Sequence, residues 1–199
     1  MKFVTALVLL LIFGISCAPR PQQQTTDVNL DDSSQVILFT NHVTRYIHGQ
    51  KWRQLLYHIH PTKGITFSPY TYIDTSTAVQ MRPGGPEAFW TDTTRTLTWG
   101  YEDGTGEPIR MNFREYYEEH LYPVNFMNAE KVAFNEQIGQ GNTVNNIEEV
   151  FPNAVFTEYH FAGFNPEFGG MDWRSLRVVV EAYEGNLYVV ALVNDRWTI

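Results

Sequence analysis

Two stretches at the start of the folded region repeat apolar residues at helical spacing. In the first, the apolar positions recur every three or four residues, at Val36, Phe39, Val43 and Ile47. This spacing predicts a helix with one apolar face, capped by Ser33 or Ser34 and ended by Gly49. A second helix has its apolar positions at Trp52, Leu55, Leu56 and Ile59. It stops before Pro61, because proline disfavours helical geometry in the residue that precedes it.

The middle and the end of the chain are typical of strands. Residues 64–101 are rich in β-branched and aromatic side chains, with a break at residues 83–86, PGGP. The segment 154–161, AVFTEYHF, alternates as a strand does. Two apolar runs, LRVVVEAY and LYVVALV, flank Glu184-Gly185-Asn186 and predict a terminal hairpin. Because both of its strands are apolar on both faces, we expect the hairpin in the middle of a covered sheet.

These elements together predict the fold class. Between the strand regions, Asn112 and Glu115 form the pattern of a capping box at the start of a further helix. Helices first and long antiparallel strands last predict an α+β fold, with N-terminal helices packed on a curved, mainly antiparallel sheet. The length suits one globular domain, which we place at residues 33–199.

The first residues follow a different pattern. Met1 and Lys2 precede an apolar run from Phe3 to Ile15. A membrane-spanning helix needs about 20 apolar residues, so this shorter run is typical of a signal peptide. We expect residues 1–16 to direct export and to be removed, and residues 17–32 to be a flexible tether, since they have little apolar surface to bury.

The single cysteine of the chain stands at the predicted cleavage site. The segment Gly14-Ile15-Ser16-Cys17 resembles the lipobox of bacterial lipoproteins, although leucine is usual where Gly14 stands. The resemblance implies that Cys17 receives acyl chains such as palmitate and becomes the mature N-terminus. Two or more such chains suffice for a stable anchor. The alternative is ordinary cleavage near Ser16, which leaves Cys17 as a free thiol.

Location and charge limit the partners. By the resemblance to lipoproteins, Ala18 is compatible with anchoring in the outer membrane as well as in the cell membrane. The net charge is −8, and the loss of residues 1–16 would make it more negative, because it removes one lysine. Nucleic acid is not an expected partner, because its binding requires clustered Lys and Arg. Beyond the membrane, the expected partner is a small molecule, a glycan or another envelope protein.

One candidate for catalysis lies in the strand 154–161. Glu158 and His160 are two residues apart, so they share a face of the strand. A carboxylate beside a histidine can fix the imidazole tautomer and raise its pKa, as in a general base. The chain has no Gly-x-Ser-x-Gly motif to supply a nucleophile. An ordinary half-buried pair is the competing interpretation.

Candidates for ligand binding lie in the same strand and in the segment MDWRSLR. Asp172 and Arg174 can pair on one face, or Arg174 can offer its planar fork to a ligand carboxylate. Asp172 is also a candidate acidic partner of His160. Trp173 and Tyr159 combine an apolar ring with a polar edge, which suits sugars or aromatic ligands. Aromatic residues make up 15% of the chain, and filling a β-rich core is the competing explanation.

Metal and cofactor chemistry find no support. His58 and His60 would point about 200° apart on a helix, so one ion could not bind both. We expect His58 to face solvent and His60 to cap the last helical carbonyls. The glycine-rich segments GYEDGTGEP and IGQGN lack the strand, lysine and helix of a phosphate-binding loop. We therefore predict neither a metal nor a cofactor.

A resemblance covers about residues 55–199. The segments GITFSPYTYID, FREYYEEHLY, MDWRSLR and the terminal DRWTI are similar to an uncharacterised extracytoplasmic domain of bacterial exported and lipid-anchored proteins. The order of elements is also similar to the cone-like nuclear transport factor 2-like fold. Neither resemblance implies an activity. The expected function is a lipid-anchored, non-enzymatic binding domain of the cell envelope. The alternative is a small hydrolase or isomerase that uses His160 with an acidic partner in the cone cavity.

The Cys17→Ala substitution tests the anchor. Removing the only thiol removes the acyl attachment point, so the protein should move from the membrane pellet to the soluble fraction in cell fractionation, and labelled palmitate should mark only the wild type. The control Thr25→Ala should stay in the pellet. A C17A protein that still pellets with the membranes, or a wild type that takes up no label, contradicts an acyl anchor at Cys17.

Overall fold

A computed structural model describes residues 28–198 of the chain. The predicted signal peptide, Cys17 and most of the predicted tether lie outside the described residues.

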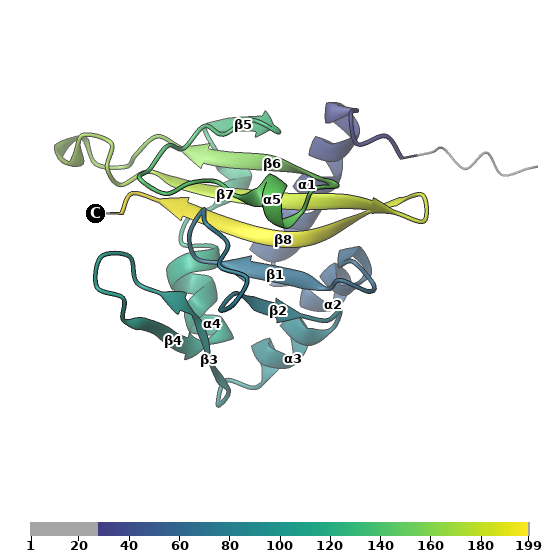
Figure 1. Ribbon diagram of the computed structural model, residues 1–199, viewed down its shortest axis with the longest axis horizontal. Coiled ribbons are helices and arrows are strands. Elements are labelled where there is room, and N and C mark those ends of the chain that lie inside the picture. Colours follow the sequence, from purple (N-terminus) through teal and green to yellow (C-terminus); the bar gives the residue numbers. More distant parts are fainter. Residues whose placement is uncertain (1–27, 199) are drawn as a thin grey trace, which may run out of the picture.

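The centre of the fold is an open six-stranded sheet with the order β2-β1-β8-β7-β6-β5 (Figure 1). Its pairs are antiparallel except for the parallel pair β1–β8. The strands are β1 (Ile65–Ser68), β2 (Val79–Met81), β5 (Lys131–Phe134), β6 (Ala154–Phe161), β7 (Arg174–Tyr183) and β8 (Asn186–Arg196). Strands β3 (Thr96–Tyr101) and β4 (Pro108–Asn112) form a separate pair.

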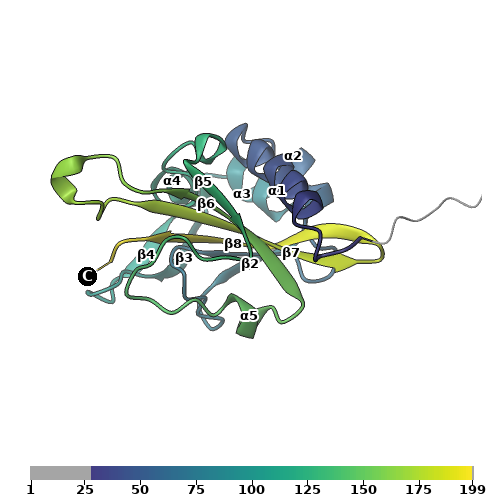
Figure 2. The ribbon, with the colours of Figure 1, turned by 90° about the horizontal axis from the view of Figure 1, so that it is seen from above.

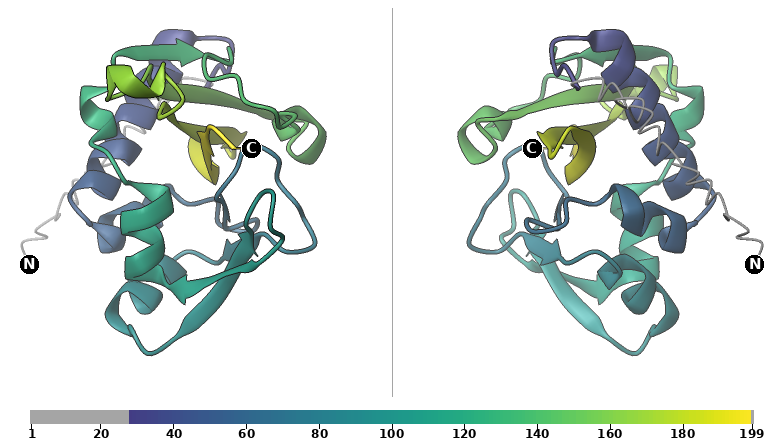
Figure 3. Two further views of the ribbon diagram at one scale, coloured as in Figure 1. Left: turned by 90° about the vertical axis from the view of Figure 1, so that its left-hand side faces the viewer. Right: turned by 90° about the vertical axis from the view of Figure 1, so that its right-hand side faces the viewer.

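Most helices cover one face of the sheet. The helices α1 to α4 lie on one side and α5 lies on the other, as Figure 2 shows. The α-helices are α1 (Ser33–His48), α2 (Trp52–Leu55), α3 (Gly85–Thr91), α4 (Phe113–Tyr116) and α5 (Ile147–Val150). The short 3₁₀ segments are η1 (Leu56–His58), η3 (Phe126–Asn128) and η4 (Pro166–Phe168), and η2 (Tyr117–Leu121) is a π-helix that continues α4. Figure 3 shows the β3–β4 pair below the sheet, joined to α4.

The terminal hairpin is buried on both faces, as its sequence predicts. Leu176 and Val178 pack into the main core under the helices. Val179 and Val193 pack into a second core on the opposite face, under α5. The hairpin β7–β8 is therefore the central layer between two apolar cores.

The structure confirms the α+β class and most of the predicted elements, and it corrects some details. The first helix is capped by Asp32, whose Oδ1 accepts from Ser34 N at 3.0 Å and Gln35 N at 3.2 Å, and not by a serine. The second helix is shorter than its pattern indicates, because it continues as a 3₁₀ turn after Leu55. Helix α3 begins at Gly85, within the PGGP segment, in a region whose sequence predicts strands. The cone shape stays a prediction.

The capping box at α4 gives a test of the local sequence rule. Asn112 Oδ1 accepts from Arg114 N at 2.9 Å, and the Glu115 carboxylate accepts from Asn112 N at 2.8 Å. Asn112→Ala should lower the free energy of unfolding by about 1 kcal/mol, because two N-terminal amides of α4 lose their acceptor. Asn112→Ser keeps an acceptor and should cost less. Urea denaturation of both variants measures the difference, and equal losses would contradict the capping role.

Candidate functional site

The predicted residue Glu158 belongs to a charged cluster that is buried on the sheet face opposite α1. The Arg177 guanidinium donates to Glu158 Oε2 at 2.8 Å and to Asp195 Oδ2 at 2.9 Å. It also donates to Thr71 Oγ1 and to the carbonyl of Gly139. Both Glu158 and Arg177 are inaccessible to solvent. Every strong contact of this arginine is therefore made inside the protein.

His160 is joined to this cluster through Ser175. The Ser175 hydroxyl donates to Glu158 Oε1 at 2.6 Å, and His160 Nδ1 lies 2.8 Å from the same hydroxyl oxygen. Since the single hydroxyl proton is used on Glu158, Nδ1 donates and carries the proton of the neutral ring. Burial lowers the pKa of His160, although the neighbouring Glu158 charge acts in the opposite direction. The imidazole is therefore neutral at pH 7.

Trp173 covers His160 and is itself buried. The two ring centroids are 5.8 Å apart. A Cβ at Gly139 would lie 2.5 Å from the Trp173 ring and 2.7 Å from Ser175 Oγ, so only glycine fits the loop at this point. The structure thus brings Glu158, His160 and Trp173 together, but beneath a loop.

Tyr159 lies on the other face of the sheet, because neighbouring residues of a strand point in opposite directions. Its hydroxyl forms hydrogen bonds with Thr40 Oγ1 and Asn41 Oδ1, both at 2.9 Å. The predicted ligand residue therefore fixes α1 to β6, and it does not share a site with His160.

Asp172 and Arg174 make separate contacts. Asp172 Oδ2 accepts from Phe164 N at 3.0 Å and Asn165 N at 2.8 Å, which closes the loop before β7 and helps to lower the pKa of Asp172. Arg174 Nη1 donates to the carbonyls of Asp172 and Trp173. Among the described residues, no ion pair joins the two side chains, so the predicted pairing is not formed.

The two histidines near Pro61, His58 and His60, lie in different environments. His60 is buried, and its Nδ1 accepts from Thr62 N at 3.3 Å and Lys63 N at 3.1 Å, so it closes a turn instead of capping helical carbonyls. His58 is half-buried and stacks on Tyr46. Within residues 28–198, no three His, Cys, Asp or Glu side chains come together as a metal site requires.

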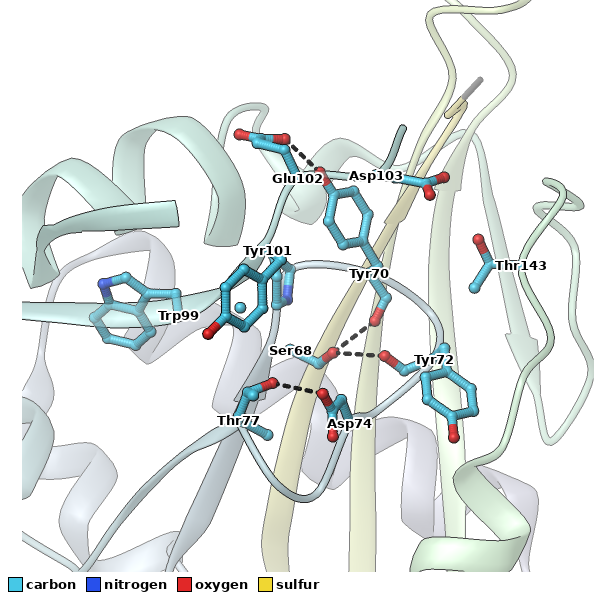
Figure 4. Close-up of a pocket in the computed structure, with 13 residues that line it drawn as sticks. Ser68, Tyr70, Tyr72, Asp74, Thr77, Trp99, Tyr101, Glu102, Asp103 and Thr143 are labelled. Carbon is cyan, nitrogen blue, oxygen red and sulfur yellow. Dashed lines mark hydrogen bonds between the residues drawn. The ribbon is translucent and has the colours of Figure 1, made fainter. Parts of the chain in front are cut away.

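The strongest candidate site is an aromatic pocket of about 290 Å³ at one end of the sheet (Figure 4). Three segments build it: the connection from β1 to β2, the end of β3 with the turn that follows, and Thr143. Two of its rings, Tyr72 and Tyr101, are 51% and 49% exposed. The lining consists of Ser68, Pro69, Tyr70, Tyr72, Asp74, Thr77, Ala78, Trp99, Gly100, Tyr101, Glu102, Asp103 and Thr143.

Local geometry brings the two main walls together. The register of β3 and β4 shifts between Thr98 and Tyr101, a β-bulge in which Gly100 adopts φ +143°. A Cβ at Gly100 would approach Pro69 Cγ to 3.3 Å, so glycine lets β3 lie close to the β1–β2 connection. On that connection, Ser68 Oγ donates to the carbonyls of Tyr70 and Tyr72.

The pocket is held in shape from behind by buried contacts. Thr71, between two pocket tyrosines, is bonded to Arg177. Ile73 is held by both ends of the Asn146 amide, with Ile73 N donating at 2.8 Å and the Ile73 carbonyl accepting at 3.1 Å. The β1–β2 connection is therefore fixed at Thr71 and at Ile73.

The electrostatics of the pocket are acidic. Among the residues that line it, Asp74, Glu102 and Asp103 are carboxylates and none is Lys, Arg or His. Tyr70 donates to Glu102 Oε2 at 2.6 Å and accepts from Arg196 Nη2 at 3.1 Å, behind the wall (Figure 4 shows the Tyr70–Glu102 bond). Burial and the Glu102 hydrogen bond raise the pKa of Tyr70, which keeps its hydroxyl protonated.

The pocket residues were not among the candidates that the sequence indicates. Their only signal is the density of aromatic residues in SPYTYID and TWGYED, which also fits a core. Trp99, for example, lines the pocket and is also fully buried against Tyr116, with ring centroids 3.8 Å apart.

Comparisons with known proteins add no assignment to this geometry. The chain matches no family model, no curated protein and no solved structure.

The buried charge cluster predicts a pH effect. Burial raises the pKa of Asp195 from 3.8 to about 6, against the opposing charge of Arg177. Because the folded pKa is the higher one, the folded state gains stability as the pH falls through about 6. From pH 7 to pH 5, the wild type should gain about 1 kcal/mol relative to Asp195→Asn.

Urea denaturation of both proteins at the two pH values measures this gain. The histidines occur in both proteins, so their contributions cancel in the difference. A difference that does not change with pH would contradict the raised pKa of Asp195.

Proposed function

We propose that the protein is a lipid-anchored, non-enzymatic binding domain of the bacterial envelope, and that its aromatic pocket binds a sugar ring of a glycan. The observation that carries the proposal is the combination of partly exposed tyrosines and carboxylates around one pocket. Cys17 is the proposed attachment point to the membrane.

The lining chemistry supports a hydroxyl-rich ligand. Tyr72 and Tyr101 offer ring faces on which a sugar ring can stack. Asp74, Glu102 and Asp103 are hydrogen-bond acceptors for sugar hydroxyls, and their charge disfavours an anionic ligand. A pocket of about 290 Å³ suits one small ring.

The pocket is also prepared for binding before a ligand arrives. The hydrogen bonds of Ser68, Thr71 and Ile73 hold the β1–β2 connection in place. Binding to a preformed wall avoids the entropic cost of ordering a loop.

The alternative, an enzyme that uses His160, has weaker support. His160 does have an acidic partner, since its Nδ1 lies 3.9 Å from Glu158 Oε1. Glu158, however, already accepts from Ser175, Arg177 and two loop amides. His160 is only 7% exposed and does not line the pocket. These contacts favour a structural role for the cluster.

No helix in residues 28–198 has both the length and the apolar character that crossing a bilayer demands.

Oligosaccharide titration tests the pocket. The full chain in detergent is titrated with oligomers of N-acetylglucosamine and of glucose, and Trp fluorescence is recorded because Trp99 lines the pocket. We expect saturable binding of at least one series. Tyr72→Ala and Tyr101→Ala should each weaken it about fivefold, through the loss of a stacking face worth about 1 kcal/mol.

The matched control is Tyr57→Ala, which removes a tyrosine that is 73% exposed and outside this pocket. It should bind as the wild type does. Equal affinity of all four proteins, or binding of neither series, would overturn the proposed glycan site.

A further inference from the structure

A second group of polar side chains lies behind the pocket wall, at the same end of the sheet but facing the helices. Arg174 and Arg196 are directly opposite each other on β7 and β8. Asn194 shares the face of Arg196, two residues before it on β8. Its Nδ2 donates to the carbonyl of Leu121 at 3.1 Å, which brings η2 onto this part of the sheet.

The two arginines are incompletely compensated by protein charges. Like charges directly opposite on neighbouring strands repel each other. Burial lowers the pKa of Arg174, and the charge of Arg196 lowers it further. Arg196 has an ion pair with Glu102 at 3.5 Å, whereas the side-chain bonds of Arg174 among the described residues are to two backbone carbonyls.

Three buried polar atoms in this neighbourhood have no protein partner. They are the Tyr116 hydroxyl, His120 Nδ1 and Asn194 Oδ1. The three residues are 0%, 5% and 5% exposed. The Tyr116 and His120 rings stack with centroids 5.5 Å apart, on the segment where α4 passes into the π-helix η2. Helical segments of this rare kind are frequent at functional sites.

The Asn194–Leu121 hydrogen bond places η2, which contains His120, against β8, which contains Arg196. Burial, with smaller effects of the Arg196 and Arg174 charges, lowers the pKa of His120 to about 4, and Glu102 acts in the opposite direction. Burial strongly raises the pKa of Tyr116, and the Arg196 charge opposes this effect. At pH 7 the histidine is therefore neutral and the tyrosine is protonated, so that both offer neutral polar groups beside two guanidinium forks.

We propose that Arg174 and Arg196, with Tyr116, His120 and Asn194, form a binding site for a small hydroxycarboxylate. The guanidinium groups suit the two oxygens of a carboxylate, and the Tyr116 hydroxyl is a further donor to it. The Asn194 carbonyl is an acceptor for the ligand hydroxyl. This site is distinct from the aromatic pocket, whose lining carries the opposite charge.

A titration of the full chain in detergent with sodium lactate tests the site. The probe-dependent shift of the His120 ring resonances is followed by NMR at constant ionic strength, with acetate and inorganic phosphate as parallel arms. We expect saturable shifts with lactate. Acetate should bind about tenfold more weakly, because it lacks the hydroxyl that would donate to the Asn194 carbonyl. Phosphate binding as tight as that of lactate, or no saturable shift with lactate, would overturn the proposal.

Tyr116→Phe is the decisive variant. It keeps the ring that stacks on Trp99 and removes only the hydroxyl without a protein partner, so its melting temperature should not fall. Lactate affinity should decrease about tenfold, the usual effect of one lost hydrogen bond to a charged group. Tyr57→Phe is the matched control and should bind as the wild type does. Unchanged affinity of Tyr116→Phe would contradict the assignment.

Arg174→Lys adds a second variant that keeps the charge and removes the fork. It should also weaken lactate binding. Since Tyr72→Ala should leave lactate binding unchanged, failure of this site and failure of the proposed glycan site are distinguishable.

Discussion

The buried guanidinium of Arg177 is the interaction on which the rest of the structure depends. A fully buried arginine is tolerated only where carboxylates and hydrogen-bond acceptors replace its water. Here it contacts Glu158 on β6, Asp195 on β8, Thr71 before β2 and the loop at Gly139. One charge thus joins segments that are far apart in the sequence. Because Thr71 stands between Tyr70 and Tyr72, the same charge also sets the position of the pocket aromatics.

The packed apolar part of β7 and β8 and the part next to the proposed binding sites lie at opposite ends of these strands. Toward the hairpin turn, both faces of β7 and β8 are apolar and packed. Toward the other end, the helix face changes to Asn194 and Arg196, next to the pocket. Figure 1 shows the start of α1 near the hairpin turn and the C-terminus at the opposite end. Val28 and Asn186 line a common groove, which agrees with this arrangement. The described part of the chain therefore begins at the end of the sheet opposite the pocket.

The sequence predicted those features that depend on neighbours along the chain. The apolar spacing in α1, the alternation of β6 and the terminal hairpin are local patterns, and each corresponds to an element of the structure. The shared face of Glu158 and His160 follows from the strand period and is also confirmed, since both belong to one cluster. What the cluster does could not be predicted, because Arg177 and Asp195 reach it only through cross-strand register. The pocket was missed for the same reason: its walls, at residues 68–78 and 99–103, meet only because a β-bulge brings β3 close to the β1–β2 connection.

The two proposed sites are physically linked through Tyr70 and Glu102. The Tyr70 hydroxyl donates to Glu102 and accepts from Arg196, and Arg196 also pairs with Glu102. A carboxylate bound at Arg196 would compete with Glu102 for this guanidinium. Glu102 would then carry a less compensated charge into the pocket and accept more strongly from a hydroxyl-rich ligand. Since coupling between two sites is reciprocal, a sugar that engages Glu102 would in turn free Arg196 for a carboxylate. The hydrogen-bonded chain of Glu102, Tyr70 and Arg196 therefore separates the two sites, and binding at either site would favour binding at the other.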